Sequence, residues 1–289
     1  MKCPKCNNEI VSKQSFCDNC GKDLKNSYIE EYAPRHIISI GVYYVIIYLL
    51  VTIVQLAIMA AYTLLTDKPI FDESNEILPQ AENFIMIWNQ IIIYFILFVT
   101  ISMILIKDII YDLSKLKHNF KKCLKHAGIG IILMYAVNFF LTIINNKLNI
   151  SGSSVNQTTI ENMILNSGSL ELFLYSIVLV VFAPIVEELI FRKSMFQILK
   201  KFKFSTTKKI IISGLLFGLL HVLSTIISYI ATGADTMTII IELVYSLPYI
   251  GTGFILSYIY AETNENVATP IFAHMFNNAM SCVAIFLLY

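Results

Sequence analysis

Apolar residues recur along this chain in blocks long enough to cross a lipid bilayer as helices. A helix rises 1.5 Å per residue, so about 20 apolar residues span a hydrocarbon core of about 30 Å. Seven blocks meet this length: Ile37–Leu65, Phe84–Ile106, Ala127–Asn145, Leu170–Ile190, Ile210–Ala231, Met237–Tyr260 and Val267–Leu288. Pro248, Gly251 and Gly253 interrupt the sixth block, which is therefore either one kinked helix or two shorter helices. The pattern predicts an all-α polytopic membrane protein with seven to eight transmembrane helices.

Polar stretches between these blocks divide the chain into parts. Residues 1–25 form a polar, cysteine-containing head, and residues 26–36 form a linker. Residues 37–150 hold the first transmembrane helices and residues 170–289 hold the rest. Between the two groups, Ser151–Ser169 is rich in Ser, Asn and Thr, which predicts an exposed loop with at most one interfacial turn.

Composition agrees with a bilayer as the solvent. Hydrophobic residues make up 56% of the chain and charged residues only 14%, and the mean hydropathy is +0.68. A soluble domain needs more polar surface than this, and a nucleic-acid-binding protein needs a basic patch, so neither class is expected. The first apolar block begins near Ile37, which is too late for a cleavable signal peptide.

The basic residues predict the orientation in the membrane. Six Lys or Arg lie in Met1–Arg35, six in Lys107–His126 and seven in Phe191–Lys209. These segments share one side of the seven-helix arrangement, and the opposite side keeps only Lys68 and Lys147. Because basic loops stay in the cytoplasm, we expect a multi-pass plasma-membrane protein with a cytoplasmic N-terminus.

Four cysteines form two pairs in the head. Cys3 and Cys6 are separated by two residues, as are Cys17 and Cys20. Two such pairs can supply the four thiolates of a structural Zn²⁺ site, and a segment this short needs a metal in order to fold. The alternative is a set of redox-active or incidental thiols. We expect a structural zinc ribbon that serves in anchoring, sensing or binding a protein partner, without catalysis, because four protein ligands leave no open position on the ion.

Three groups of polar side chains lie within apolar helices. The first contains Glu187, Glu188 and Arg192 near the end of the fourth block. Residues four apart share one helix face, so Glu188 and Arg192 can form an ion pair. Glu187 is rotated by about 100° from Glu188 and can point into the bundle. The alternative is that both carboxylates are solvated at a helix end.

The second and third groups contain histidines. His221 lies in the fifth block, four residues after Phe217, at a depth where an ionised side chain costs about 2.5–3.5 kcal/mol to insert. Gly214 and Gly218 nearby permit close packing of another helix. In the last block, His274 and Asn278 are four residues apart and project from one face. Either histidine can instead be a hydrogen-bonded structural residue.

Together these groups contain what amide hydrolysis requires. A carboxylate or imidazole can activate water, and imidazole and amide donors can stabilise an oxyanion. The sequence shows no serine or cysteine arranged for covalent catalysis and no H-E-x-x-H motif. Two histidines and a glutamate from three helices could also hold Zn²⁺. Participation of a metal therefore stays open, and we favour the metal-free reaction because the Asn beside His274 suits an oxyanion site.

The order and spacing of these motifs resemble a known family. Glu187-Glu188-x-x-x-Arg192, Phe217-x-x-x-His221 and His274-x-x-x-Asn278 resemble the CAAX protease and bacteriocin-processing family of intramembrane proteases, sometimes described as metalloproteases. The resemblance covers residues 170–288. It implies that Glu187 and His221 activate water, that His274 and Asn278 hold the oxyanion, and that Glu188, Arg192 and Phe217 support them.

The sequence therefore predicts an intramembrane endopeptidase that cuts a membrane-associated or lipid-anchored peptide or protein near the cytosolic face. The alternative is a non-proteolytic protein of the same fold, acting in bacteriocin immunity or as an envelope scaffold. A transporter is less favoured, because no inverted repeat is visible. The sequence does not identify the substrate.

Overall fold

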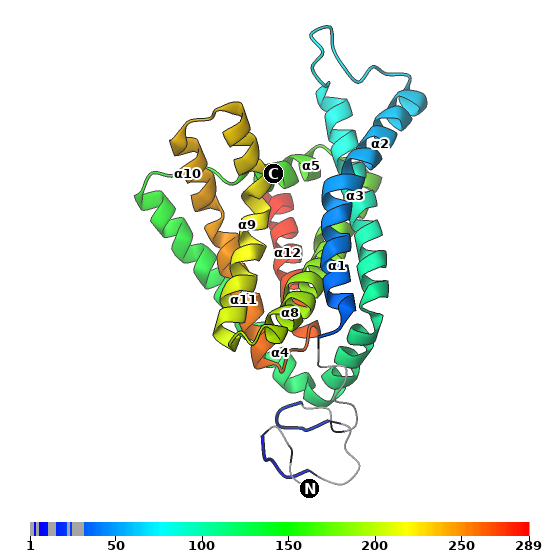
Figure 1. The fold of residues 1–289 in the computed structure, drawn as a ribbon. Coiled ribbons are helices and arrows are strands. Elements are labelled where there is room, and N and C mark those ends of the chain that lie inside the picture. The colour runs from blue at the N-terminus through cyan, green and yellow to red at the C-terminus, as the bar shows by residue number, and fades with distance from the viewer. Residues whose placement is uncertain (1–2, 4–5, 11–15, 22–23, 25–31, 289) are drawn as a thin grey trace.

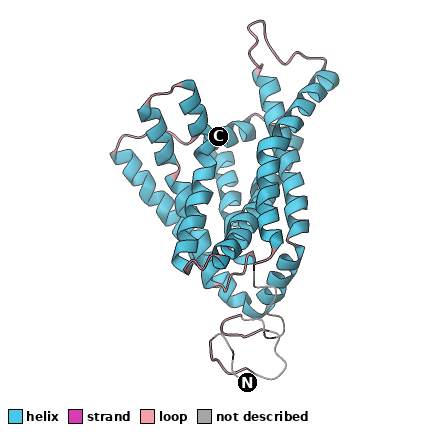
Figure 2. Ribbon diagram, in the orientation of Figure 1, coloured by secondary structure: helices cyan, strands magenta, loops and turns pink. Residues whose placement is uncertain are grey.

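The computed structural model describes residues 3, 6–10, 16–21, 24 and 32–288, and helices account for nearly all of its regular structure (Figure 1). No β-strand is drawn in these ranges (Figure 2). An isolated antiparallel bridge joins Phe71 and Ile77 in the loop between the first two long helical segments, which end at Thr66 and begin at Pro79. The predicted all-α class is confirmed.

The elements follow one another as α1 (Pro34–Val45), η2 (Ile46–Leu50), α2 (Val51–Thr66), α3 (Pro79–Ile104), α4 (Ile106–Lys147), α5 (Val155–Leu165), α6 (Ser169–Ile177), η3 (Val178–Phe182), α7 (Ala183–Glu188), η4 (Leu189–Ser194), α8 (Met195–Lys201), α9 (Thr206–Thr232), α10 (Thr236–Tyr245), α11 (Leu247–Glu262) and α12 (Ala268–Leu288). The three η elements are single π-helical stretches inside longer helices.

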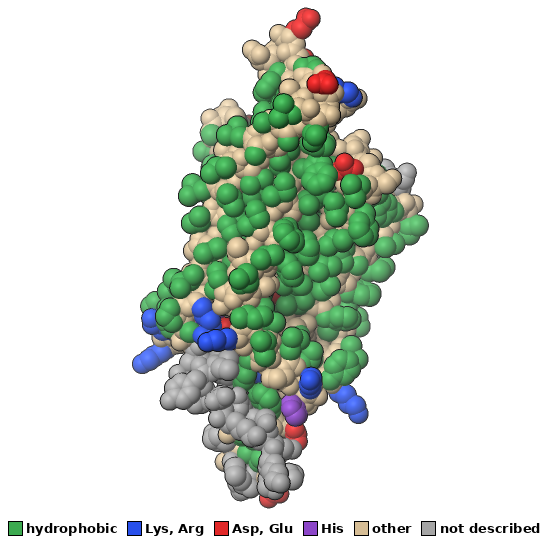
Figure 3. Space-filling model, turned by 90° about the vertical axis from the view of Figure 1, so that its right-hand side faces the viewer, with side chains coloured by type: hydrophobic (Ala, Val, Ile, Leu, Met, Phe, Trp, Pro, Cys, Tyr) green, Lys and Arg blue, Asp and Glu red, His purple; other side chains and the backbone are tan. Residues whose placement is uncertain are grey.

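These elements join into seven helical spans that are long and apolar enough to cross a membrane: Pro34–Thr66, Pro79–Ile104, Ile106–Lys147, Ser169–Lys201, Thr206–Thr232, Thr236–Glu262 and Ala268–Leu287. Figure 3 shows apolar side chains covering the middle of one face, with most visible Lys and Arg side chains toward the end near the N-terminal head. Such a belt is expected where lipid surrounds the helices, so the chain is a multi-pass membrane protein.

The third span is longer than the sequence predicted. Residues 107–126 were expected to form a basic loop, but they are helical and belong to α4, which bends at Asn119 (φ −120°, ψ 18°). Asp108, Asp112 and Lys115 are buried on this part of α4. These buried charges are tolerated because other segments of the fold give each of them a partner. The pattern of residues along the sequence does not show those partners.

Two other segments also differ from the simplest expectation. The sixth span consists of two helices, α10 and α11, which meet at Ser246 just before Pro248. The polar segment expected to be a loop contains α5, whose N-terminal amide at Gln157 donates to the Ser154 side chain. Ser154 therefore acts as a helix cap, which is a common use of serine in polar connections.

Glycines allow α9 and α11 to pack closely. A Cβ on Gly218 would lie 2.5 Å from the backbone nitrogen of Ile250, and one on Gly253 would lie 2.6 Å from the carbonyl oxygen of Gly214. Only residues without a Cβ permit this approach. The prediction that Gly214 and Gly218 bring a helix close is confirmed, and the contact places Phe217 and His221 of α9 against α11.

The described part of the cysteine head contacts the membrane helices beside the bend of α4. The Phe16 ring lies 5.6 Å from the Tyr111 ring and 5.4 Å from the His118 ring. Gly21 adopts a left-handed conformation (φ +64°), and a Cβ there would lie 3.0 Å from Asn119 Nδ2. Residues 11–15 of the head and residues 26–31 of the predicted linker lie outside the described ranges.

Candidate active site

One cavity of about 440 Å³ lies among α3, α4, η3, α9, α11 and α12. Its lining includes Glu187, His221, His274 and Asn278, together with Phe217. These residues come from three different spans, yet the fold brings them to one space. Sequence reasoning grouped them by chemistry, and the structure places all five on the wall of a single cavity.

Glu188 lies behind this cavity and connects two helices. It is fully buried, and its Oε1 lies 2.9 Å from Nδ1 of His274 on α12. Its Oε2 lies 3.0 Å from Nε of Arg192 on the next helical turn. The predicted pairing of Glu188 and Arg192 is therefore present. An ionised carboxylate only accepts hydrogen bonds, so the Nδ1 proton of His274 is donated to Glu188.

Arg192 is itself held by α9 and α11. Its Nη2 donates to the carbonyl oxygen of Gly253 over 3.2 Å, and its guanidinium lies 4.5 Å from the centre of the Phe217 ring. Arginine suits such a buried position because its planar group can pair with a carboxylate and stack on a ring at once. Arg192 thus fixes Glu188, and through Glu188 the ring of His274.

Glu187 points to the other side of the same helix, into the cavity. Its Oε2 lies 3.9 Å from Nε2 of His274, which is beyond hydrogen-bond length. Tyr94 of α3 also lines the cavity and has the Glu187 carboxylate as a neighbour. The two adjacent glutamates therefore occupy different surroundings, one closed behind the cavity and one facing it.

His221 is oriented by two contacts. Its Nδ1 lies 2.8 Å from the carbonyl oxygen of Phe217, one turn earlier on α9. A carbonyl can only accept, so the proton of the neutral ring is on Nδ1 and the lone pair of Nε2 is free. The ring also stacks on Tyr249 of α11, with centroids 4.6 Å apart and an interplanar angle of 12°.

Tyr249 was not identified from the sequence, although it shapes the site. Its hydroxyl is within 3.0 Å of Ser154 Oγ and 3.2 Å of Asn156 Nδ2, so it ties the cap of α5 to the ring of His221. The only signal for it was its position after Pro248, in the block that the sequence already marked as irregular. A tyrosine in an apolar helix gives no further indication.

Asn278 keeps part of its hydrogen-bonding capacity. Its Nδ2 donates to the carbonyl oxygen of Leu179 over 2.9 Å, in the π-helical stretch η3. An amide group carries two N–H donors, so one remains available toward the cavity. The glutamate pair itself lies between η3 and η4, and π-helical turns inside α-helices are frequent at functional sites.

The cavity extends away from the cysteine head. It continues from Glu187 past Asn145 at the end of α4 to the exposed residues Gly152 and Ser153. In Figure 1 this end of the bundle, with α5 and the C-terminus, lies opposite the head. The expected reaction near the cytosolic face stays a prediction, and the cavity itself extends toward the end of the bundle opposite the head.

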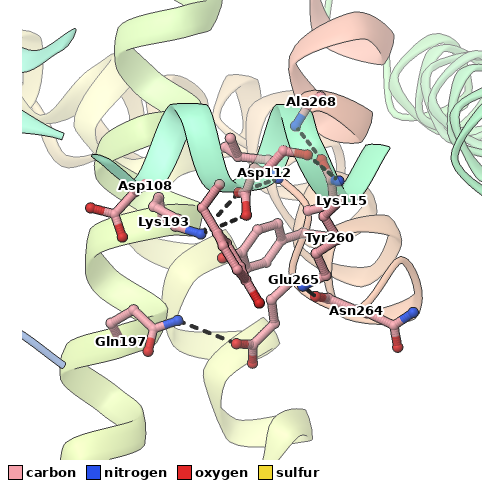
Figure 4. Close-up of polar contacts among 12 residues, drawn as sticks. Asp108, Asp112, Lys115, Lys193, Gln197, Tyr260, Asn264, Glu265 and Ala268 are labelled. Atoms are coloured by element: carbon pink, nitrogen blue, oxygen red, sulfur yellow. Dashed lines mark hydrogen bonds and ion pairs between the residues drawn. The ribbon is translucent and has the colours of Figure 1, made fainter. Parts of the chain in front are cut away.

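Ion pairs fill the head end of the bundle instead. Lys193 Nζ lies 2.9 Å from both carboxylate oxygens of Asp112, and Lys209 Nζ lies 2.8 Å from Glu265 Oε1. Figure 4 shows Lys193 directed at Asp112 and Gln197 directed at Glu265. Lys193 belongs to η4, which continues into α8 at the head end of the bundle (Figure 1), so these ion pairs lie between Glu187 and the head. Sequence counting assigned Lys193 and Lys209 to a cytoplasmic loop, but both are buried.

The four head cysteines could hold one metal ion. Their sulfur atoms lie within 4.8 Å of one another, with 3.4 Å between those of Cys3 and Cys20 and 3.6 Å between those of Cys6 and Cys17. A tetrahedron with bonds of about 2.3 Å has edges of about 3.8 Å, so four thiolates in this arrangement suit such an ion. Among the described residues, the possible ligand atoms of Glu187, His221 and His274 do not all lie within 4.8 Å of one another, as those of the four cysteines do.

Comparison with known proteins agrees with the motif resemblance. Residues 169–280 match the family model described as type II CAAX prenyl endopeptidase Rce1-like. The chain is also 29% identical over 178 residues to the UPF0177 protein YxdF of Lactococcus lactis subsp. lactis (strain IL1403), a match that covers 60% of this chain and 85% of that protein. No solved structure matches the chain. The segment that matches the family model contains Glu187, His221, His274 and Asn278, and it does not include the cysteine head.

Proposed function

We propose that this protein is an intramembrane endopeptidase that hydrolyses a peptide bond of a membrane-associated peptide or protein. The observation that carries the proposal is the convergence of Glu187, His221, His274 and Asn278, drawn from three spans, on one cavity. The match of residues 169–280 to a family of prenyl endopeptidases supports it. In this proposal residues 170–289 are the protease core, and residues 37–150 complete the wall of the cavity.

Glu187 and His221 activate the water. Glu187 supplies the only carboxylate among the described residues that line the cavity, so it takes the proton of the attacking water. His221 accepts a hydrogen bond from the second hydrogen of the water at Nε2, because its Nδ1 proton is donated to Phe217. The proton then passes from Glu187 to the leaving amine when the carbon–nitrogen bond breaks.

His274 and Asn278 stabilise the oxyanion. Asn278 offers the amide hydrogen that Leu179 does not use. His274 is held by Glu188 through Nδ1, and in this proposal its Nε2 side faces the oxyanion. Donors aimed at the position where negative charge develops are worth about 10²–10³ in rate each. Glu188 and Arg192 hold His274 in place from behind the cavity, and Phe217 supports them from the cavity wall.

The proposed setting is the plasma membrane, with the head in the cytoplasm. The basic residues near the head support this orientation. The cavity then opens toward the outer side of the membrane, since it extends to the end of the bundle opposite the head. The head carries a structural Zn²⁺ on Cys3, Cys6, Cys17 and Cys20 and binds a protein partner.

A cleavage assay with matched variants tests the proposal. The purified full-length protein in detergent is incubated with a peptide library, and the products are identified by mass spectrometry. We expect Glu187→Gln and His221→Ala to lower the rate by about 10²–10⁴-fold. Glu171→Gln is the control for the first variant, because Glu171 lies on α6, the first segment of the same helical span, and does not line the cavity.

His126→Ala is the control for the second variant. The Nδ1 of His126 also lies 2.8 Å from the carbonyl oxygen one turn earlier, at Lys122, but the ring is outside the cavity. Both controls should retain full activity. Cleavage that persists in Glu187→Gln and His221→Ala would remove the proposal. If the protein cleaves no peptide, a non-proteolytic immunity or scaffold protein of the same fold remains, and its cellular phenotype should survive both substitutions.

A further inference from the structure

The charge of the cavity indicates which peptides fit it. Among the described residues that line it, Glu187 is the only acidic side chain and there is no Lys or Arg. Lys193 on η4 and Lys209 on α9 are at the other end of the bundle, where Lys209 pairs with Glu265 and Lys193 with Asp112. A ligand group in the cavity therefore meets one carboxylate, two imidazoles, and otherwise amides, hydroxyls and apolar groups.

One part of the wall is apolar. Met163 of α5, Val178 of η3, and Cys282 and Ile285 of α12 line the cavity and belong to one buried hydrophobic cluster. Asn278 lies on α12 between His274 and this cluster and bonds to Leu179 of η3. An apolar side chain next to the scissile bond would therefore remove apolar surface from water when it binds here.

Another part of the wall is polar but uncharged. Asn138, Thr142 and Asn145 of α4 face the cavity along one stripe of that helix, and Thr252 of α11 lies on the wall as well. The Oδ1 atom of Asn138 is buried and has no hydrogen-bond partner among the described residues. Side-chain amides and hydroxyls of this kind can hydrogen-bond the backbone of an extended peptide without carrying charge.

We propose that the cavity takes an extended, uncharged stretch of peptide with an apolar residue beside the cut, and that it disfavours peptides whose free C-terminus lies close to the cut. This inference rests on the proposed function. A peptide that ends within three residues of the cut places its carboxylate within about 10 Å of Glu187. A carboxylate buried there without a cation, near a second carboxylate, is strongly unfavourable.

Peptide pairs that differ only at the C-terminus test this directly. A sequence cleaved by the protein is synthesised with two residues after the cut, either as the free acid or as the amide. A second pair carries eight residues after the cut. We expect the short amide to be cleaved with a kcat/KM at least about tenfold higher than the short acid, while the two long peptides are cleaved equally.

A variant that adds a cation sharpens the test. Asn138→Lys places a positive charge on the cavity wall, and Asn138→Gln changes the size of the side chain without adding charge. Asn138→Lys should raise cleavage of the short acid relative to the short amide, and Asn138→Gln should not. Lys147→Gln is a further control, because Lys147 is the basic residue nearest in sequence to the cavity-lining Asn145 and should not affect the ratio.

The outcomes separate this inference from the proposed function. If the short acid is cleaved as well as the short amide, or if Lys147→Gln selectively lowers its cleavage, the cavity recognises a C-terminal carboxylate and the inference is overturned while the peptidase stands. If no peptide is cleaved in a manner that depends on Glu187, both are overturned.

Discussion

Two regions of this bundle bury polar side chains, and they differ in how completely their charges are paired. At the head end, the carboxylates of Asp108, Asp112 and Glu265 each meet at least one basic side chain within 4 Å. Among the described residues, the nearest basic group to Glu187 is His274 at 3.9 Å, and Nε2 of His221 has no hydrogen-bond partner. One region closes its interactions internally, and the other keeps atoms available.

Because of this difference, one polar region can stabilise the fold while the other can bind a ligand. Buried charges are expensive unless they are paired, so the head-end pairs lower a cost that the helices would otherwise bear. Atoms left without partners in the cavity cost stability, and such a cost is common where a substrate later supplies the partner. Glu188 stands between the two, since it is paired with Arg192 yet positions His274 for the cavity.

The largest expected effect is on the rate of peptide cleavage and comes from removing the charge of Glu187, which has no cationic partner within hydrogen-bond length. Glu187→Gln should lower peptide cleavage by about 10³-fold, because the base that takes the proton of water is lost. The unfolding temperature in detergent should change by less than about 4 °C, which corresponds to about 1 kcal/mol for a chain of this size. Cleavage and thermal unfolding are measured on the same preparation. A large loss of stability would mean that Glu187 is a structural residue.

The opposite pattern is expected at the head end. Asp112→Ala leaves Lys193 buried without its partner and also removes the acceptor for the backbone amide of Val267. The free energy of unfolding should fall by about 3–5 kcal/mol, as is usual when one member of a buried pair is removed. The measurement is equilibrium unfolding in detergent with a denaturant.

The double variant Asp112→Leu with Lys193→Met is the control for this prediction. It removes both charges, so it should recover much of the loss caused by Asp112→Ala. If the single and double variants are equally unstable, the ion pair is not the source of the effect.

A smaller effect is expected at Glu265, which lies between the sixth and seventh spans. Burial alone raises the pKa of Glu265, but the charges of Lys200 and Lys209 outweigh burial and hold the pKa at about 2. Because this value is below the ordinary 4.5, the ionised form stabilises the folded state. That stabilisation is complete above pH 4.5 and is lost as the pH falls toward 2.

Glu265→Gln should therefore lose about 1 kcal/mol at neutral pH and should show a flatter dependence of stability on pH between 4.5 and 2 than the wild type. Thermal unfolding at a series of pH values checks this. A variant curve that falls as steeply as the wild type would assign the acid sensitivity to another group.

The smallest effect on the bundle is expected from the head. Cys17→Ser should abolish binding of about one equivalent of Zn²⁺, measured by metal analysis, because the site needs four thiolates. The described head residues reach the helices mainly through Phe16 and Gly21, so the unfolding free energy of the bundle should change by less than about 1 kcal/mol. Cys123→Ser, a cysteine outside the head, should keep the metal. Equal loss of metal in both variants would argue against the four-cysteine site.

Much of the fold was predictable because the bilayer constrains a chain strongly. Blocks of apolar residues of sufficient length must be helices in lipid, and the seven spans follow from that requirement. The prediction failed where charges lie inside helices, as in the first part of α4 with Asp108 and Asp112, because a charged stretch reads as a loop until its partners are known. It also missed α5, whose polar sequence is typical of both a loop and a capped surface helix.

The candidate site was predictable in its residues and not in its surroundings. Glu187, His221, His274 and Asn278 stand out because ionisable and amide groups are rare in apolar helices. Tyr249 and Asn138 do not stand out, since a tyrosine or a single asparagine has many structural uses in such helices. Their importance lies in what they contact, and contacts between distant spans are absent from a linear pattern.

By itself, the sequence determined the helical class, the number of spans, the four-thiol head and the chemical inventory of the cavity. It did so because each depends on local periodicity, ligand spacing or the cost of a polar group in lipid. Only the tertiary structure decided that Glu188 faces Arg192 and His274 while Glu187 faces the cavity, and that the cavity extends away from the head. Those outcomes depend on how α9, α11 and α12 pack around the fourth span, and packing between helices is a property of the whole bundle.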